Sequence, residues 1–247
     1  MTKSLVIVPT YNEKENVGKI IQMILSLPEN FSVVVVDDQS PDGTAQIVRD
    51  NMPEYPERLF LLERKGKLGL GTAYIHGFQW GLNQGFDYLF EMDADFSHNP
   101  SNLPDLLYEL SENGSDVVIG SRYVKGGRVE NWPWDRKLLS YGASLYVRII
   151  TGMPVKDPTA GFVGYRREVL ESIDLNSIRF IGYAFQIEMK FSAYRLGFNL
   201  TEIPITFVDR VAGISKLSSN IINEAVMGVL AMRFKNCSKK DVTPRPR

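Results

Sequence analysis

The chain is poor in the side chains that most often build metal clusters and covalent cross-links. Its 247 residues include one cysteine, Cys237, and two histidines, His76 and His98. A single cysteine excludes an internal disulfide framework and a cysteine-built zinc site, and it fits a reducing compartment. The two histidines are too few and too far apart in the sequence to predict a histidine metal site. We therefore expect a cytoplasmic protein without a structural zinc ion.

Long apolar runs and an excess of one charge are also absent. No segment approaches the roughly 18 apolar residues of a membrane-spanning helix, and the N-terminus lacks the pattern of a signal peptide. The 28 Lys and Arg residues nearly balance the 29 Asp and Glu residues, for a net charge of -1. This balance argues against a nucleic-acid partner. If the protein meets a membrane, we expect peripheral contact with its cytoplasmic face.

In the first half of the chain, β-branched runs alternate with helix-like segments. Strands are expected over residues 5–9, 32–37, 59–63, 88–93 and 116–121. Apolar spacing predicts a helix over residues 13–27, and Asp42 offers the N-cap of a helix that ends near residue 50. The alternation is typical of a Rossmann-like α/β fold, with a mostly parallel sheet flanked by helices. Ligands of such sheets bind beyond the carboxyl ends of the strands.

The second half of the chain is less regular. Residues 124–135 carry glycines, charges and two tryptophans without a periodic pattern, which predicts a mobile loop that can act as a lid. Helices are expected over residues 137–150, 184–196 and 218–234, and strands over residues 161–165 and 200–208. Residues 1–235 then form one domain, and residues 236–247 form a disordered basic tail.

Acidic side chains follow several of the predicted strands. Asp93 and Asp95 end an apolar strand, where both carboxylates can approach one divalent cation, and oxygen ligands suit Mg²⁺ or Mn²⁺. A bare Asp-x-Asp is more often an exposed acidic turn. Here Asp38, Asp42 and Glu13 are expected near the same crevice, and they repel one another unless cations or hydrogen-bond donors compensate. A metal ion and a nucleotide would supply both.

Five segments together form a recognisable pattern. They are VPTYNE at residues 8–13, VDDQSPDGT at 36–44, GLGTA at 69–73, DAD at 93–95 and GSRY at 120–123. In this order they resemble the inverting family 2 glycosyltransferases, and within that family the dolichol-phosphate and polyprenol-phosphate mannosyltransferases. The resemblance extends from the first strand to Lys216. It implies one glycosyltransferase domain of the GT-A type, with a nucleotide-sugar half over residues 1–122 and an acceptor half over residues 123–235.

The resemblance also implies which residues bind the nucleotide-sugar and the metal. The residues expected along the nucleotide-sugar are Pro9, Tyr11, Glu13, Asp38, Asp42 and Lys67. The first three line the base and ribose of GDP-mannose, and Asp38 lies at the base end. Asp93 and Asp95 hold Mg²⁺ or Mn²⁺ on the diphosphate, which makes Asp95 a catalytic residue. Family members often carry Gln two residues after the second Asp, where this chain has the shorter Ser97, so the metal preference stays open.

A phosphate acceptor needs cations more than it needs a general base. The second pKa of a phosphate monoester is near ~6, so its oxygen is already an anionic nucleophile at neutral pH. Guanidinium groups bind phosphate in bidentate fashion. The basic residues expected in loops that face the crevice are Arg122, Arg128, Arg136, Arg210 and Lys216. The resemblance matches Arg122, Arg210 and Lys216 to positions around the acceptor phosphate and the leaving group, with the first two catalytic. The alternative for any of the five is a solvated surface charge.

Residues 157–162 and 185–188 match the same family and are expected on the sugar and acceptor side. Gln186 and Glu188 are therefore predicted to bind substrate. Glu188 is a candidate for three roles. It could act as a general base, accept a hydrogen bond from a sugar hydroxyl, or serve as a structural cap partner. Only the last two roles are needed if the acceptor is a phosphate.

The expected reaction is transfer of a hexose, mannose from GDP-mannose, to the phosphate of a polyprenyl lipid with inversion. The alternatives are a glucosyltransferase that uses UDP-glucose, a family 2 enzyme with a sugar-hydroxyl acceptor, and a nucleotide-sugar-binding protein without activity. The Asp93 and Asp95 pair argues against the last of these.

Two segments repeat apolar residues at helical spacing, over residues 138–150 and 221–234. Packing in the core is the favoured interpretation of both segments. Insertion into a membrane interface is the alternative, with Arg148 and Arg233 among the basic residues that can meet anionic headgroups. A membrane-anchored partner protein is also compatible with the resemblance.

Overall fold

The computed structural model describes residues 2–209 and 228–233 of the chain. The strands are β1 (Ser4–Thr10), β2 (Ser32–Asp37), β3 (Leu59–Glu63), β4 (Tyr88–Glu91), β5 (Val117–Ser121), β6 (Arg128–Glu130), β7 (Val163–Arg166), β8 (Leu200–Pro204) and β9 (Thr206–Val208). The α-helices are α1 (Val17–Leu25), α2 (Thr44–Asn51), α3 (Leu70–Asn83), α4 (Leu103–Ser111), α5 (Trp134–Thr151), α6 (Arg167–Ser172) and α7 (Tyr183–Arg195). Residues 228–233 are also helical.

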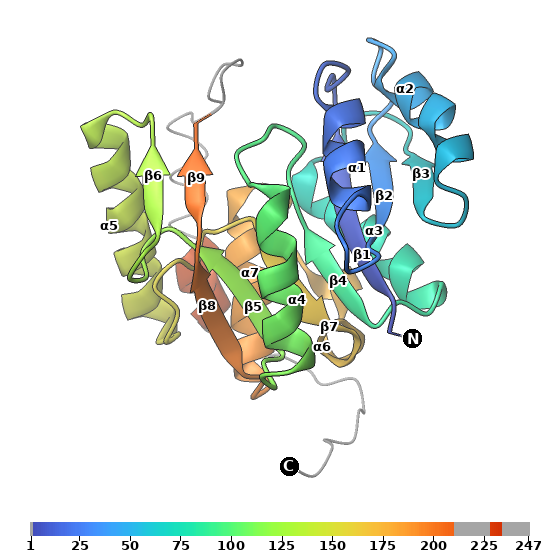
Figure 1. Cartoon of the computed structure of the whole chain (residues 1–247). Coiled ribbons are helices and arrows are strands. Elements are labelled where there is room, and N and C mark those ends of the chain that lie inside the picture. The colour runs from blue at the N-terminus through green and yellow to red at the C-terminus, as the bar shows by residue number, and fades with distance from the viewer. Residues whose placement is uncertain (1, 210–227, 234–247) are drawn as a thin grey trace.

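The centre of the molecule is a seven-stranded sheet in the order β3-β2-β1-β4-β7-β5-β8 (Figure 1). All neighbouring strands pair in parallel except β7, which runs antiparallel to both β4 and β5. The valine run of β2, residues 33–36, is completely buried, as expected for a parallel strand covered on both faces. The predicted α/β fold with a mostly parallel sheet and flanking helices is confirmed.

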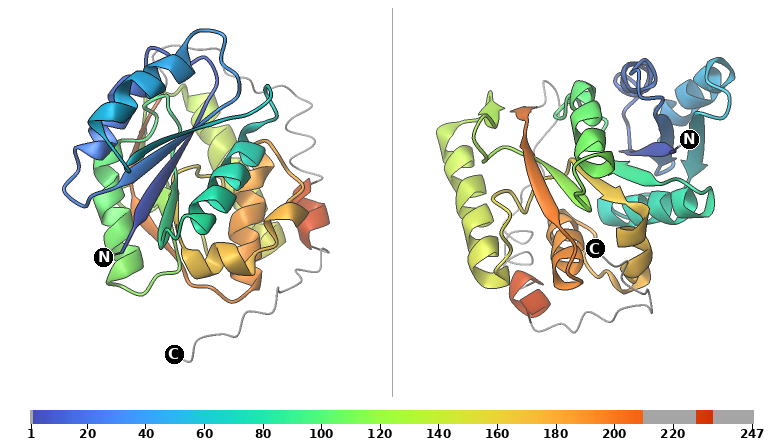
Figure 2. Two further views of the ribbon diagram at one scale, coloured as in Figure 1. Left: turned by 90° about the vertical axis from the view of Figure 1, so that its right-hand side faces the viewer. Right: turned by 60° about the horizontal axis from the view of Figure 1, so that its bottom comes forward.

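Helices cover both faces of this sheet, and the pleat of each strand divides its residues between them. On β1, Leu5 and Ile7 pack with Tyr74 and Phe78 of α3, in a cluster that also contains residues of α6 and α7. The intervening Val6 of β1 packs into a second cluster with apolar residues of α1, α2 and α4. The left view of Figure 2 shows the sheet between these two helix layers.

The strand order reverses beside β1, and this reversal positions the site. The chain moves from β1 to β2 and β3 on one side, and then returns to pair β4 with the other side of β1. Such a switch point opens a crevice beyond the carboxyl ends of the strands, because consecutive connections leave in opposite directions. The segments that follow β1, β2, β4 and β5 therefore share one edge of the sheet, as the sequence predicted.

Several predicted boundaries were wrong in the second half of the chain. Residues 124–135, predicted as a mobile loop, contain β6, which pairs in parallel with β9. Helix α5 starts at Trp134, before the expected residue 137. The strand expected over residues 200–208 is divided at Ile205, whose N–H donates to Ser121 O (3.1 Å) and whose C=O accepts from Arg128 N (3.0 Å). Three-residue strands are too short to leave a periodic signal in the sequence.

The predicted cap of α2 was displaced by one residue. The N-cap is Gly43, with a left-handed φ of 94°, and the helix starts at Thr44. Asp42 lies one position earlier, where its Oδ1 accepts hydrogen bonds from the backbone N (3.0 Å) and the hydroxyl (2.6 Å) of Thr44. Its carboxylate supports the start of the helix from outside the cap position.

The predicted core packing of residues 138–150 was also wrong for most of the apolar residues in that segment. Tyr146 and Ile150 pack against the core. Five others are more than two fifths exposed: Leu138, Leu139, Tyr141, Leu145 and Ile149. In the part of the chain that the structure describes, no helix has the length and apolar character to cross a bilayer. The helix predicted over residues 218–234 is described only from 228 to 233, and the tail of residues 236–247 lies outside the described residues.

Candidate active site

The carboxyl ends of β1 and β2 are tied together by a buried carboxylate. Asp37 is 0% exposed and accepts hydrogen bonds from the Thr10 hydroxyl (2.8 Å), the Ser40 hydroxyl (2.6 Å) and the Ser40 backbone N–H (2.8 Å). Because these donors all come from the chain itself, Asp37 shapes the turn after β2.

Asp38 forms a second buried contact at the same edge, with an arginine that the sequence analysis missed. Arg64 Nε donates to Asp38 Oδ1 (2.6 Å), and the two side chains are 7% and 8% exposed. The same guanidinium donates to Thr72 Oγ1 (2.7 Å) and to Gly69 O (3.2 Å), and Leu68 N donates to Asp38 Oδ2 (3.3 Å). The ion pair therefore holds the glycine-rich loop before α3 against the end of β2.

Two residues predicted for the nucleotide side come together at the surface. The Lys67 ammonium lies 4.4 Å from the centroid of the Tyr11 ring, within the range of a cation–π interaction. The Tyr11 side chain is 38% exposed, so the aromatic face and the cation both border solvent. Pro9 lies in β1 opposite Val36, beyond the last residue of β1 that pairs with β4, so its missing N–H breaks no hydrogen bond to β4.

Glu13 and Asp42 organise the turns in which α1 and α2 begin. Glu13 N donates to Thr44 Oγ1 (3.0 Å), and Glu13 Oε2 accepts from Asn16 Nδ2 (2.9 Å). Lys14 N donates to Asp42 Oδ2 (3.1 Å). Partial burial opposes ionisation of Asp42, but hydrogen bonds from Thr44 and Lys14 lower the pKa of its carboxyl below the ordinary value. Their predicted contacts with the nucleotide stay predictions.

Asp93 and Asp95 follow β4 as predicted, and each carboxylate is oriented by a donor of the chain. The buried Tyr74 hydroxyl donates to Asp93 Oδ1 (3.0 Å), and Ser97 N donates to Asp95 Oδ1 (3.0 Å). Burial and the negative charge of Asp93 raise the pKa of Tyr74 well above its ordinary value, so its hydroxyl stays protonated as a donor. A Cβ added to Gly161 would lie 3.9 Å from Asp93 Oδ2, so the Gly161 backbone lies next to this carboxylate.

The donor set of Asp93 and Asp95 fits a hard divalent cation that binds together with a diphosphate. Within the described residues, no group of three or more His, Cys, Asp or Glu side chains has the arrangement of a metal site. Mg²⁺ is typically held by one or two carboxylates, with substrate phosphates and waters completing its octahedron. Two carboxylates at the switch point of the sheet match that arrangement.

Behind these carboxylates lies a buried polar network between β4 and α7. Glu91 and Lys190 are 0% exposed and Gln186 is 5% exposed. Gln186 Nε2 donates to Glu91 Oε2, while Lys190 Nζ donates to Ala160 O (2.6 Å), Gln186 O (3.0 Å) and Gln186 Oε1 (3.2 Å). Burial raises the pKa of Glu91 and lowers that of Lys190, while their mutual attraction opposes both shifts. The network fixes the backbone next to Gly161.

Arg122 follows β5 and is engaged with a second buried carboxylate. Its Nε and Nη2 donate to Asp157 Oδ2 and Oδ1, each at 2.7 Å, and its backbone N donates to Oδ2 (3.0 Å). Nη2 also donates to Thr159 Oγ1 (2.8 Å). The guanidinium carbon lies 5.2 to 5.6 Å from the ring centroids of Tyr123, Trp132 and Phe207. Arg122 thus holds residues 157–159, and its contact with an acceptor phosphate stays a prediction.

The other predicted cations are arranged differently from the sequence expectation. Arg136 lies in the first turn of α5, where its Nη1 donates to Asp209 Oδ2 (2.8 Å) and its guanidinium stacks 4.3 Å from the Trp132 ring centroid. Arg128 is exposed on β6. Both therefore lie in regular elements rather than in the loops that the sequence predicted. Arg210 and Lys216 lie outside the described residues.

Glu188 lies inside α7 and is 2% exposed. Its Oε2 accepts hydrogen bonds from the backbone N–H groups of Arg179 (2.9 Å) and Phe180 (3.1 Å). Of the three roles considered from the sequence, these contacts are those of a structural cap partner. A base at this position would first have to release the two amides.

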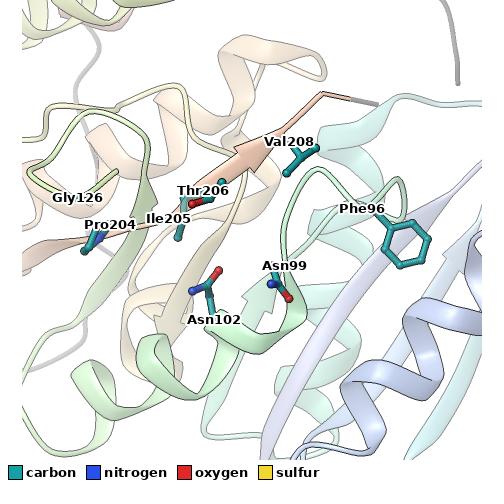
Figure 3. Close-up of a pocket in the computed structure, with 8 residues that line it drawn as sticks. All are labelled: Phe96, Asn99, Asn102, Gly126, Pro204, Ile205, Thr206 and Val208. Atoms are coloured by element: carbon teal, nitrogen blue, oxygen red, sulfur yellow. The ribbon is translucent and has the colours of Figure 1, made fainter. Parts of the chain in front are cut away.

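A separate pocket of 270 Å³ lies beside the loop after Asp95 (Figure 3). Its lining residues are Phe96, Asn99, Asn102, Gly126, Pro204, Ile205, Thr206 and Val208. Figure 3 shows the two asparagine side chains opposite Ile205 and Thr206, with Phe96 at one end and Gly126 at the other. None of the residues predicted to bind substrate lines this pocket, so it is distinct from the predicted site.

The mostly parallel sheet, its switch point and the paired carboxylates are features expected of a nucleotide-sugar-dependent transferase. The sequence model of glycosyl transferase family 2 matches residues 5–174. This chain belongs to that family and is a glycosyltransferase, which confirms the resemblance seen in its motifs.

Curated proteins match this chain over most of its length, among them the following two. The polyprenol monophosphomannose synthase of Mycolicibacterium smegmatis is 46% identical over 227 residues, which are 92% of this chain and 85% of that protein. The undecaprenyl-phosphate mannosyltransferase of Micrococcus luteus is 47% identical over 225 residues, which are 91% of each chain.

Solved structures share the fold at lower identity. The glucosyl-3-phosphoglycerate synthase of Mycobacterium tuberculosis, solved with Mn²⁺, uridine diphosphate and glucosyl-3-phosphoglycerate, superimposes with a TM-score of 0.66 at 19% identity. The match covers 94% of this chain and 80% of that one. Together with the family match, this similarity confirms the predicted GT-A type of fold.

Proposed function

We propose that this glycosyltransferase moves mannose from GDP-mannose to the phosphate of a polyprenyl lipid, with inversion at the anomeric carbon. The observation that carries the proposal is the 46% and 47% identity to two proteins named for polyprenyl-phosphate mannose synthesis, across more than nine tenths of this chain. The reaction would use a nucleotide side, a pair of carboxylates that hold a metal ion and a set of cations, and the predicted site residues are our candidates for these three parts.

In the proposed reaction, an oxygen of the lipid phosphate forms a bond to the anomeric carbon while the bond to the diphosphate breaks. The acceptor oxygen is already an anion at neutral pH, so no side chain has to remove a proton. This fits the contacts of Glu188, which accepts two backbone hydrogen bonds.

The residues of the chain position the two substrates in this proposal. Tyr11 and Lys67 border the base and ribose, and the Asp38–Arg64 pair holds the loop beside them. Asp93 and Asp95 would hold Mg²⁺ or Mn²⁺, which would neutralise charge on the diphosphate leaving group. The acceptor is a membrane lipid, so we further propose that the protein works in peripheral contact with the cytoplasmic face of a membrane, alone or with a membrane-anchored partner.

The direct test is transfer of labelled sugar to lipid. Purified protein is incubated with radiolabelled GDP-mannose or UDP-glucose, a polyprenyl phosphate and Mg²⁺ or Mn²⁺, and label in the organic phase is counted. Label from GDP-mannose alone supports the proposal. Label from UDP-glucose keeps the reaction but changes the sugar, and no label from either donor contradicts a lipid-phosphate acceptor.

Two variants show whether the reaction uses the predicted site. Asp95→Ala should abolish transfer and leave the fold intact, while Asp50→Ala, an exposed aspartate of α2, should retain full activity. Arg210→Ala should weaken transfer to the lipid phosphate more than it weakens nucleotide-sugar binding. Equal losses in both measurements would argue against an acceptor role for Arg210.

A further inference from the structure

Helix α5 exposes a continuous apolar stripe along its whole length. We define the α5 stripe as Trp134, Leu138, Tyr141, Leu145 and Ile149, which are 77%, 64%, 51%, 43% and 72% exposed. Their spacing of four, three, four and four residues places them on one face of the helix. The opposite face, with Ser144, Val147 and Thr151, is buried against the domain. Scattered exposed apolar residues are ordinary, but a contiguous apolar face marks an interaction surface.

Charge is almost absent from the exposed side of this helix. Between Leu138 and Ile149 the only charged residue is Arg148, and it is partly buried. The cations lie at the two ends. Lys137 is exposed in the first turn of α5, next to the exposed Asp135, and Arg233 is exposed near Gly152, at the carboxyl end of α5. An apolar face with cations at its ends suits the boundary between the acyl chains and anionic headgroups of a bilayer.

The stripe is physically connected to the Arg122 segment of the site. The Tyr123 hydroxyl donates to Ser140 Oγ on α5 (2.7 Å), and the Tyr123 ring meets Tyr141 of the stripe edge-to-face at 5.4 Å. Tyr123 is also the residue next to Arg122 in the chain. A surface that bound the α5 stripe would therefore lie next to the segment predicted to meet the acceptor phosphate.

Helix α5 also lies at the edge of the molecule. In Figure 1 and in the right view of Figure 2 it is at the far left, on the opposite side from α2 and β3. Its 18 residues extend about 27 Å at 1.5 Å per residue. The helix can therefore lie flat on a surface without obstruction from the nucleotide half of the domain.

We propose that the α5 stripe is the surface by which this enzyme lies on a lipid bilayer, with its apolar side chains at the level of the acyl chains. The proposal rests on the proposed function in one respect, because a polyprenyl-phosphate acceptor makes a bilayer the surface that must meet the Arg122 segment. A second copy of the chain has no such relation to the site, and it enters as an outcome of the test.

The first experiment measures binding to vesicles by sedimentation. Vesicles of phosphatidylcholine with phosphatidylglycerol are mixed with wild-type protein, with a Leu138→Glu and Ile149→Glu double variant, and with a matched double variant. The matched variant carries Met23→Glu on α1 and Tyr108→Glu on α4, at apolar positions that are 41% and 56% exposed. The α5 variant should bind at least about 10-fold more weakly than the wild type, and the matched variant should bind like the wild type.

Two results would overturn the proposal. One is vesicle binding by the α5 variant equal to that of the wild type, provided that both proteins unfold at the same temperature. The other is a wild-type dimer, measured by light scattering, that the α5 variant loses while its vesicle binding persists.

Tryptophan fluorescence gives an independent readout, because Trp134 is 77% exposed. Vesicles should shift the emission of the wild type to the blue, and Trp134→Phe should remove that shift.

A second experiment separates failure of this proposal from failure of the proposed function. Transfer is measured to a long-chain polyprenyl phosphate in vesicles and to a short-chain, water-soluble polyprenyl phosphate. The α5 variant should lose most of its rate with the vesicle substrate and keep its rate with the soluble one. Equal rates for variant and wild type on both substrates would overturn the role of the stripe. No transfer by the wild type to either acceptor would overturn the proposed function and leave the vesicle-binding result to decide the stripe.

Discussion

Replacing Asp157 by asparagine tests whether Arg122 is held by a buried ion pair. The Arg122 and Asp157 side chains are 8% and 0% exposed, and the carboxylate accepts two guanidinium hydrogen bonds and one backbone hydrogen bond. An asparagine has nearly the same shape but carries no charge, and its amide group presents donors where the carboxylate has an acceptor oxygen. The variant therefore leaves the Arg122 charge buried without its counterion.

The expected loss in the free energy of unfolding is large, because removing one partner of a buried ion pair costs about 3–5 kcal/mol. A domain of this size loses about 2–4 °C of melting temperature per kcal/mol, so Asp157→Asn should melt about 6–20 °C below the wild type. The matched control is Glu63→Gln, which breaks the Arg49–Glu63 pair, whose side chains are 44% and 48% exposed. Exposed pairs contribute about 0–1 kcal/mol, so the control should melt within about 4 °C of the wild type.

The effect should also depend on pH in a defined direction. Burial opposes ionisation of Asp157, but the hydrogen bonds and charge of Arg122 hold the pKa of its carboxyl below the ordinary value of 3.8. A carboxyl with a lowered folded-state pKa stabilises the fold above its unfolded-state pKa, and this contribution is lost as the pH falls through the folded-state value. The difference in unfolding free energy between wild type and Asp157→Asn should therefore be full at neutral pH and shrink below 3.8.

Urea unfolding followed by circular dichroism measures this difference at neutral and acidic pH. Equal stability of Asp157→Asn and Glu63→Gln at neutral pH would refute the assignment of a buried ion pair. A loss that stayed constant as the pH fell below 3.8 would show that it arises from packing rather than from charge.

Three further predictions concern the nucleotide and metal side. Tyr74→Phe removes the hydroxyl that orients Asp93, so the metal concentration for half-maximal transfer should rise about 10-fold in a metal titration. Arg64→Met releases the glycine-rich loop, so the Kd for nucleotide-sugar measured by calorimetry should rise about 10-fold. Lys190→Met removes the three hydrogen bonds that the buried ammonium donates to Ala160 and Gln186, so the free energy of unfolding should fall by about 1–3 kcal/mol in urea.

Each of these predictions has a control that separates a local effect from a general one. Tyr88→Phe removes a tyrosine hydroxyl at the amino end of β4 and should leave the metal dependence unchanged. Arg58→Met removes hydrogen bonds to Phe31 O and should lower stability without weakening nucleotide-sugar binding. An unchanged metal titration in Tyr74→Phe, or an unchanged Kd in Arg64→Met, contradicts the corresponding assignment. Wild-type stability in Lys190→Met would show that the hydrogen bonds of the ammonium do not stabilise the fold.

The sequence predicted the sheet because the signals for its strands and helices are local. The valine run of β2 and the apolar spacing of α1 each lie within a few residues, and both elements formed where they were expected. The pairing of β6 with β9 joins residues 128–130 to residues 206–208, and no local pattern in either segment indicates its partner. The antiparallel insertion of β7 between β4 and β5 is a long-range pairing of the same kind.

The apolar periodicity of α5 predicted a helix but not which of its faces is buried. A repeat of apolar residues every three or four positions fixes that they share one face, but it carries no information on whether that face turns inward. Core packing was the more frequent outcome and was therefore expected. In the structure, the buried face of α5 carries Ser144, Val147 and Thr151, and the larger apolar side chains of the helix are exposed to solvent.

The acidic residues at the strand ends are weaker evidence for a metal ion than their positions in the sequence suggested. Asp38, Asp42 and Glu13 were expected to repel one another unless cations or hydrogen-bond donors compensate, and a metal and a nucleotide were the suggested sources of both. The chain itself supplies donors to all three, including Arg64, which lies 26 residues from Asp38 in the sequence. Clustered carboxylates at strand ends are therefore weak evidence for a metal, and the case for one rests on Asp93, Asp95 and the family.

The ion pairs of Arg122 and Arg136 also change which cations are expected to bind the acceptor phosphate. The charge of Arg122 is offset by Asp157, and that of Arg136 is paired with Asp209, so these two ion pairs add little net positive charge for an acceptor phosphate. A phosphate that carries up to two negative charges must then draw on other cations, and Arg210 and Lys216 are the remaining motif positions. Loss of Arg210 should therefore weaken acceptor binding by removing charge, whereas loss of Arg122 should act mainly by releasing residues 157–159.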